Sequence, residues 1–340
     1  MLRRPVNYLP TRADHPKTGR EQEAFHPAAA ALARERFGRK VFVRAVVEVS
    51  NFCRQNCSYC GMRRDNRSLE RFRASHDQIA ELILEHRPPS VTDINIQAGE
   101  DPKAVRELVL PLIQTLRRDS NLGISVCLGS LTPELYDQLQ AAGASVYILK
   151  FETGDPAHYT EMQSPGSFEE RTANIRYLAA RGWNVSSGFI AGLPNQSEEC
   201  LLQSFRVAAE LPLDGCSVSP FVPGDETPCA HLSAPSIDLT LNSMAALRRM
   251  RPDWLIPAVS ALNLAEPGSG YRRGLRTGAN LVTINMTPSA FRDDYLLYKR
   301  NRFIMTEEAI LRAIEAERLE PSAIGLAQHY QGRKAQLAVA

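Results

Sequence analysis

From Val41 onward, short apolar runs rich in β-branched residues alternate with longer segments that have helical spacing. Each run has the length of a buried strand, and each is followed by enough residues for a helix. The eight runs are 41–50, 92–99, 123–130, 145–153, 183–192, 214–221, 254–262 and 279–286. Eight strand–helix units predict an α/β fold, a closed (β/α)8 barrel of the TIM type, with a doubly wound open sheet as the alternative.

The same pattern predicts one domain with an extension at each end. Residues 1–40 are expected to form an N-terminal extension with one helix, over the alanine-rich run from Pro27 to Phe37. Residues 41–300 form the barrel, and residues 301–340 form a C-terminal helical tail with a helix near 306–318. In such a barrel the chemistry belongs to the loops that follow the strands.

Composition narrows the class of protein. The 340 residues include 40 Lys and Arg against 38 Asp and Glu, so the net charge of +2 favours neither nucleic acid nor a charged membrane surface as a partner. No apolar stretch approaches the roughly 20 residues that span a bilayer, and the first 16 residues lack the apolar core of a signal peptide. We therefore expect a cytoplasmic protein. Its seven cysteines are too sparse for a disulfide framework.

Three of these cysteines, Cys53, Cys57 and Cys60, follow the first predicted strand with Cys-x3-Cys-x2-Cys spacing. Thiolates are the ligands of iron–sulfur clusters, and most clusters take four, so three leave one iron open. A structural zinc site would need a fourth ligand, and neither a cysteine nor a histidine stands at suitable spacing. Packing as buried free thiols suits a polar loop less well. The triplet therefore predicts a 4Fe-4S cluster with an open iron.

The triplet, with Tyr59 before its last cysteine, resembles the signature of the radical S-adenosylmethionine (SAM) superfamily. The resemblance implies an enzyme whose open iron binds the amino and carboxylate groups of SAM. An electron from the cluster would then cleave SAM to a 5'-deoxyadenosyl radical, and a reductant such as flavodoxin or ferredoxin would supply that electron. Tyr59 is counted among the expected cofactor-binding residues.

The resemblance also assigns residues to SAM. Gly99 and Glu100, after the second strand, resemble the family's "GGE" element, which receives the methionyl ammonium. Glu152, at the end of the fourth strand, is expected at the ribose hydroxyls, and Arg171 at the SAM carboxylate. Both are charged groups of the kind that these polar parts of SAM require.

The run 188–194 resembles the "GxIxGxxE" element, which lies against the adenine of SAM. Ile190 and Gly192 are therefore expected to contact the cofactor. Asn195 and Gln196 stand where this element usually has an acidic residue. This difference would affect packing against the adenine less than it would affect a role that needs a charge.

The flanks of the triplet, 37–51 and 60–66, resemble the subgroup of biotin synthase, methylornithine synthase PylB and the FeFe-hydrogenase maturase HydE, with HydE the most similar. The similarity covers roughly residues 30–300. Lys150 stands where HydE-like proteins place an arginine, and Ser186 replaces one of the extra cluster cysteines of biotin synthase. The substrate pocket is therefore expected to differ from both.

The leading hypothesis is a HydE-like enzyme whose adenosyl radical attacks a small substrate, with a thiol- or thioether-containing metabolite as the favoured class. The alternatives are a sulfur-inserting transferase of lipoyl or biotin synthase type, acting on a free or carrier-protein-bound acyl chain, a PylB-like carbon-skeleton mutase, and a non-catalytic metal-binding scaffold. Cys127 on the third strand is the candidate catalytic residue. Cys216 and Cys229 are the residues that would join it in a second iron–sulfur cluster, which the sequence leaves open.

Overall fold

The computed structural model describes residues 6, 8–15, 17–300 and 304–339, with side chains up to residue 333. Seven parallel strands form one continuous sheet in the order β6-β5-β4-β3-β2-β1-β7, and a short β8 pairs with the start of β1. The strands are β1 (Lys40–Ser50), β2 (Asp93–Ala98), β3 (Gly123–Cys127), β4 (Val146–Ile148), β5 (Asn184–Ala191), β6 (Gly215–Pro220), β7 (Leu281–Asn285) and β8 (Glu320–Pro321).

The segment 254–262 closes this sheet into a barrel, as the apolar pattern predicts. Leu255 bridges to Gly215 of β6, and Pro257 bridges to Leu281 of β7. The segment makes these two bridges rather than a regular strand, because the proline has no N–H for a ladder. The buried Arg248 holds it in place by donating to the carbonyls of Pro252 and Trp254.

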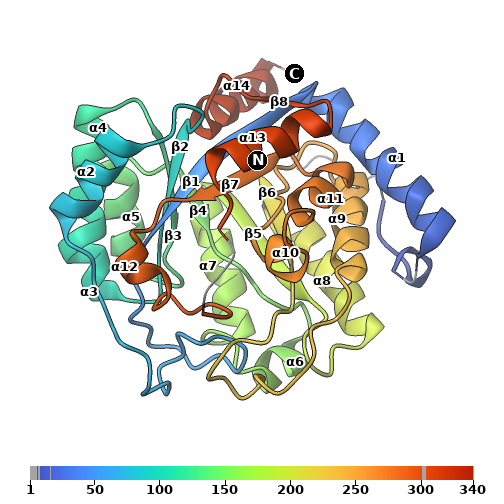
Figure 1. Cartoon of the computed structure of the whole chain (residues 1–340), viewed down its shortest axis with the longest axis horizontal. Coiled ribbons are helices and arrows are strands. Elements are labelled where there is room, and N and C mark those ends of the chain that lie inside the picture. The colour runs from blue at the N-terminus through green and yellow to red at the C-terminus, as the bar shows by residue number, and fades with distance from the viewer. Residues whose placement is uncertain (1–5, 7, 16, 301–303, 340) are drawn as a thin grey trace.

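Helices surround the barrel (Figure 1). The longer ones after the strands are α2 (His76–His86), α4 (Leu110–Asp119), α5 (Pro133–Ala142), α7 (Phe168–Ala180), α8 (Glu198–Glu210) and α9 (Asp238–Met250). The short ones are η1 (Arg12–Asp14), α3 (Pro102–Ala104), η2 (Val105–Val109), α6 (Pro156–Glu161), α10 (Ala261–Ala265), α11 (Gly270–Arg276) and α12 (Ser289–Arg292). No helix within the described residues combines the length and the apolar content that crossing a membrane requires.

The N-terminal helix α1 (Gly19–Phe37) is longer than expected. It begins eight residues before Pro27, so the prediction that the helix starts at this proline is wrong. Packing explains the difference, since α1 lies along α9 and buries Phe25 on the turn before the proline. His26 adds a 2.8 Å hydrogen bond to Asn242 of α9. These contacts offset the backbone bond that an internal proline loses.

The C-terminal helices lie at one end of the strands, opposite the loops that carry α6 and α12 (Figure 1). Helix α13 (Glu307–Ala316) begins after Thr306, within the region where a helix is expected. Helix α14 (Leu326–Val339) packs Leu326 and Tyr330 against Phe42 and the first residues of other strands. The carboxylate of Asp93 accepts the Leu326 N–H at 2.9 Å. The tail therefore covers the amino-terminal end of the barrel and leaves the opposite end for chemistry.

Candidate active site

The three clustered cysteines lie in an irregular loop between β1 and α2 that hydrogen bonds hold in one shape. Asn51, fully buried at the start of the loop, donates to the carbonyls of Glu70 and Asp294. Arg71 donates to four backbone carbonyls of the loop, including those of Asn51 and Met62. These bonds fix the shape of the loop, which lowers the entropy cost of ligation by its cysteines.

Gly99 at the end of β2 lies directly beneath this loop. A β-carbon at Gly99 would stand 2.3 Å from the carbonyl oxygen of Phe52 and 2.9 Å from Cβ of Cys53. The next residue, Glu100, donates its N–H to Sγ of Cys53 at 3.4 Å. Only glycine allows this approach. The hydrogen bond from the Glu100 N–H to the Cys53 sulfur favours the thiolate form that a metal requires.

Gly99→Ala is expected to displace the cysteine loop and to lower the iron bound per chain after anaerobic reconstitution by at least half, because the added methyl overlaps backbone atoms rather than a flexible side chain. Iron and acid-labile sulfide measure the effect. Gly332→Ala is the control, since its β-carbon meets nothing within 4 Å on an exposed part of α14. Wild-type iron content in Gly99→Ala would show that this close approach does not matter.

The buried carboxylate of Glu100 accepts four hydrogen bonds from protein groups, so it is not free to accept one from a ligand. Its Oε1 accepts from Arg171 at 2.8 Å and from the Ser130 N–H at 2.9 Å. Its Oε2 accepts from Gln55 at 2.6 Å and from Arg54 at 3.2 Å. Burial alone would raise the pKa of Glu100, but Arg171 and these donors hold it below its ordinary value. Because a carboxylate offers about four acceptor positions, the side chain is saturated by protein groups.

Arg171, by contrast, retains an unused donor. It is 3% exposed, and its Nη2 donates to Glu100 and to the Pro165 carbonyl. Its buried Nε has no hydrogen-bond partner among the described residues. An unpaired buried donor is costly, so this atom suits an anionic group of a ligand.

Glu152 follows β4 in a left-handed conformation, with φ of 62°. Its N–H donates to the Gly188 carbonyl, and its carbonyl accepts the Ile190 N–H at 2.8 Å, so two bonds to β5 hold this turn. Left-handed backbone at a non-glycine residue costs about 1 kcal/mol and often marks a functional position. Burial raises the pKa of Glu152, against the opposing effects of Lys150 and Arg171.

One cavity of about 170 Å³ brings together nearly all the residues that the sequence singles out. Its lining includes Cys53, Cys57, Tyr59, Cys60, Gly99, Glu100, Cys127, Glu152, Arg171 and Ile190. Gly192 is not part of the lining. It occupies a turn with φ of 83°, where a β-carbon would stand 2.5 Å from the Pro235 ring. Segments far apart in sequence thus meet at the carboxyl ends of the strands, as in other barrels of this type.

A second cavity of about 150 Å³ lies among the strands of the barrel, and Gln97, Cys127, Ile148 and Lys150 line both. Two cations face the inner cavity, Arg44 and Lys150, and within the described residues neither forms a salt bridge. Burial would lower the pKa of Lys150, but the nearby Glu152 raises it above its ordinary value, so the amine is charged. With these two cations and one carboxylate, that of Glu48, in its lining, the inner cavity is suited to an anionic group.

From the sequence, Lys150 was identified only as a difference from HydE-like proteins, and Arg44 was not predicted as a site residue. The available signal was a charged residue within the apolar strand β1, with Glu48 four residues later on the same face. The aromatic residues Tyr295 and Tyr298, which also line the outer cavity, carried no such signal, because they lie in an irregular segment.

The other cysteines do not join Cys127. Cys216 is packed in the main core. Cys229 lies in a smaller apolar group that also contains Ile190 and Phe221 of the outer cavity, but Cys229 itself does not line that cavity. Among the described residues, Cys127 is thus the one cysteine outside the triplet that lines either cavity.

The thiols of the triplet fit a metal cluster in their chemistry. Burial raises the pKa of all three, that of Cys60 to about 12, so they need a bound cation to become thiolates at neutral pH. Their sulfur atoms do not form a group within 4.8 Å of one another. Ligands of a single tetrahedral zinc would lie about 3.8 Å apart, given a zinc–sulfur distance of about 2.3 Å. At least one pair of the three sulfur atoms therefore lies farther apart than the ligands of a single zinc would.

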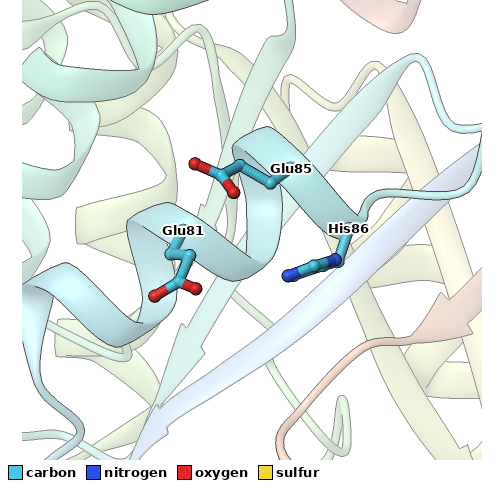
Figure 2. Close-up of side chains that lie close together, drawn as sticks. All are labelled: Glu81, Glu85 and His86. Atoms are coloured by element: carbon cyan, nitrogen blue, oxygen red, sulfur yellow. The ribbon is translucent and has the colours of Figure 1, made fainter.

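A group of Glu81, Glu85 and His86 does lie within that distance, on the surface of α2 (Figure 2). All three side chains are exposed, and they stand on neighbouring turns of one helix. Exposed acidic residues at this spacing are common on solvated helices, and the group is not part of either cavity.

Comparisons with known proteins agree with this arrangement. Residues 47–208 match the profile of the Radical SAM superfamily. The [FeFe] hydrogenase maturase subunit HydE of Thermotoga maritima is 33% identical over 81% of this chain and 79% of its own. The 3-methylornithine synthase of Methanosarcina acetivorans is 26% identical over 89% and 86%. A Nocardioides biotin synthase is 26% identical over 81% and 73%.

The crystal structure of methylornithine synthase (PylB) has the same fold, with a TM-score of 0.82 at 24% identity over 96% of this chain and 97% of that one. Members of the superfamily use a 4Fe-4S cluster and SAM, and the cavity beside the cysteine loop supplies residue types that both require. The fold, the extent of the match to HydE and the superfamily profile together place this chain in the radical SAM superfamily.

Proposed function

We propose that Cys53, Cys57 and Cys60 hold the cluster and that the adjoining outer cavity holds SAM, so that a radical forms at the boundary with the inner cavity. The observation that carries this proposal is the single cavity that the triplet shares with Glu152 and Arg171. When bound, the cluster and SAM supply an electron and a carbon-centred radical. The chain binds, orients and shields them from water.

Each lining residue has a role that its chemistry supports. Arg171 offers its unpaired Nε to a carboxylate, and Glu100 fixes the guanidinium in place. Glu152, whose carboxylate forms no hydrogen bond within the described residues, is suited to accept from ribose hydroxyls. Ile190 offers an apolar surface to an adenine. The methionyl ammonium would be received by backbone carbonyls near Gly99, since the Glu100 side chain is already saturated.

For the substrate we propose a small molecule with an anionic group, bound in the inner cavity between Arg44 and Lys150. Two buried cations in the lining, against the single carboxylate of Glu48, favour such a group. The HydE-like features of the sequence favour a thiol- or thioether-containing metabolite as its class. The similarity to 3-methylornithine synthase supports an amino-acid substrate as the second candidate.

Sulfur insertion has less support. A second cluster would need further thiolates, and Cys127 is the one additional cysteine beside either cavity in the described part of the chain. We further propose that a low-potential electron donor such as flavodoxin or ferredoxin reduces the cluster. We also propose a cytoplasmic location, which would protect an oxygen-sensitive cluster.

The test uses protein reconstituted with iron and sulfide without oxygen, then mixed with dithionite and SAM. We expect 5'-deoxyadenosine to form, and its absence from cluster-loaded protein would contradict the proposed function. Deuterated methionine, S-methylcysteine, lysine and dethiobiotin identify the substrate class, because the true class transfers deuterium into 5'-deoxyadenosine.

A further inference from the structure

His158 lies behind the outer cavity, not in its lining, and is 6% exposed. It belongs to α6, between the turn that carries Glu152 and the loop that follows Ile190. Both of its ring nitrogens have partners. Nε2 lies 2.8 Å from the Pro194 carbonyl oxygen, and Nδ1 lies 3.1 Å from the Thr153 hydroxyl.

These partners determine where the protons lie. The Pro194 carbonyl can only accept, so Nε2 carries a hydrogen, and in the Nε2–H tautomer Nδ1 is an acceptor. Nδ1 then accepts from the Thr153 hydroxyl, whose oxygen is 3.5 Å from Sγ of Cys200 and can accept from that thiol. Thr153 and Cys200 are buried, so water does not compete for these bonds.

One end of this chain of bonds reaches the Glu152 turn. Thr153 directly follows Glu152, whose left-handed backbone is held by two bonds to β5. The bond from Thr153 to His158 therefore adds a side-chain restraint on the C-terminal side of a turn whose backbone β5 already holds.

The other end reaches the turn after Ile190. The side-chain amide of Gln196 donates to the Ile190 carbonyl at 2.9 Å and accepts the Gly192 N–H at 2.7 Å. A carboxylate at position 196 could accept but not donate, so this closed pair of bonds requires an amide. Pro194 follows that turn in the sequence, and its carbonyl oxygen accepts the hydrogen bond from Nε2 of His158.

We infer that His158 is a positioning residue that joins Thr153, next to Glu152, to Pro194, beyond the end of the direct Glu152–Ile190 backbone pairing, and that it thereby orients the Glu152 side chain and the Gly192 turn for SAM. The inference rests on the proposed placement of SAM in the outer cavity. The ring joins the two segments because it donates at one edge and accepts at the other, so each segment orients its neighbour.

The test compares His158→Phe, which keeps the ring but removes both bonds, with His158→Gln, whose amide can still donate and accept. Equilibrium dialysis of SAM against cluster-loaded protein gives the dissociation constant. We expect His158→Phe to weaken SAM binding about 10- to 100-fold, since two buried hydrogen bonds are lost. We expect His158→Gln to recover at least half of that loss on a logarithmic scale.

Three further readouts separate positioning from folding or chemistry. Iron content and melting temperature report the fold, and the rate of 5'-deoxyadenosine formation at saturating SAM should stay within about twofold of wild type while KM for SAM rises. His86→Phe, on the exposed face of α2, is the matched control. If His158→Phe does not fold, Thr153→Val removes the bond to Nδ1 with little change in shape and should weaken SAM binding in the same direction.

Unchanged SAM affinity in the folded variants would overturn the inference while leaving the proposed function intact. A rate loss at saturating SAM without a change in KM, or a glutamine variant no better than phenylalanine, would also overturn it. Failure of the wild-type protein to bind SAM would overturn both.

Discussion

Cys57→Ala is expected to abolish 5'-deoxyadenosine formation and to leave the reconstituted protein without a stable cluster. Cys57 is the most buried of the three cysteines, and with two thiolates remaining a cubane would have two irons without protein ligands. Iron content, the charge-transfer absorbance and the yield of 5'-deoxyadenosine measure the loss. Cys216→Ala is the matched control, because Cys216 is also buried but lies in the main core and lines neither cavity.

The triple variant Cys53→Ala, Cys57→Ala, Cys60→Ala extends this test to the reaction type. We expect no iron to remain, because Cys127 has no second cysteine beside it among the described residues. An iron–sulfur cluster that persisted in the triple variant would instead support sulfur insertion and contradict the proposed substrate chemistry.

Arg171→Met is expected to destabilise the protein by about 3–5 kcal/mol, because it removes one member of a buried ion pair and leaves the other charged. Both side chains are at most 5% exposed, so solvent screens the pair little. Urea unfolding at pH 7 measures the change. The double variant Arg171→Met, Glu100→Gln should recover part of the loss, since it removes the unpaired charge. Equal stability of the double and single variants would contradict this account.

The Arg171–Glu100 ion pair also predicts that the stabilities of the wild type and of Arg171→Met change in opposite directions with pH. The pKa of Glu100 lies below its ordinary value in the wild type, despite burial, because Arg171 and three other donors favour the charged form. Its contribution is therefore complete above about pH 4.5, the value for the unfolded chain, and is lost as the pH falls through the lowered pKa. Without Arg171, burial should raise the pKa of Glu100. Lowering the pH from 7 toward 5 should then stabilise Arg171→Met, as unfolding at several pH values would show.

Much of the fold could be predicted from the chain because buried parallel strands appear as uninterrupted apolar runs. All eight runs occupy barrel positions, and the segment 254–262 does so even though Pro257 prevents a regular strand. The start of α1 could not be predicted, because Pro27 normally ends a helical pattern and contacts with α9, distant in sequence, make the longer helix stable.

For the site, spacing was informative where a motif is local. The triplet at 53, 57 and 60 predicts a cluster loop, since thiolates within eight residues must lie close together. Spacing could not show that the Glu100 carboxylate is saturated, because its partners come from the cysteine loop, the segment after β3 and α7.

Residue order alone thus established the barrel, the cysteine triplet and the kind of chemistry, because each depends on neighbours along the chain. Three-dimensional packing decided which charges are paired and which remain free. Arg44 lies on β1 and Lys150 just after β4, and the two come together only where the barrel encloses them. His158 acquires its two partners only when β4 and β5 lie side by side. Such arrangements depend on distances between segments far apart in sequence, which no local pattern encodes.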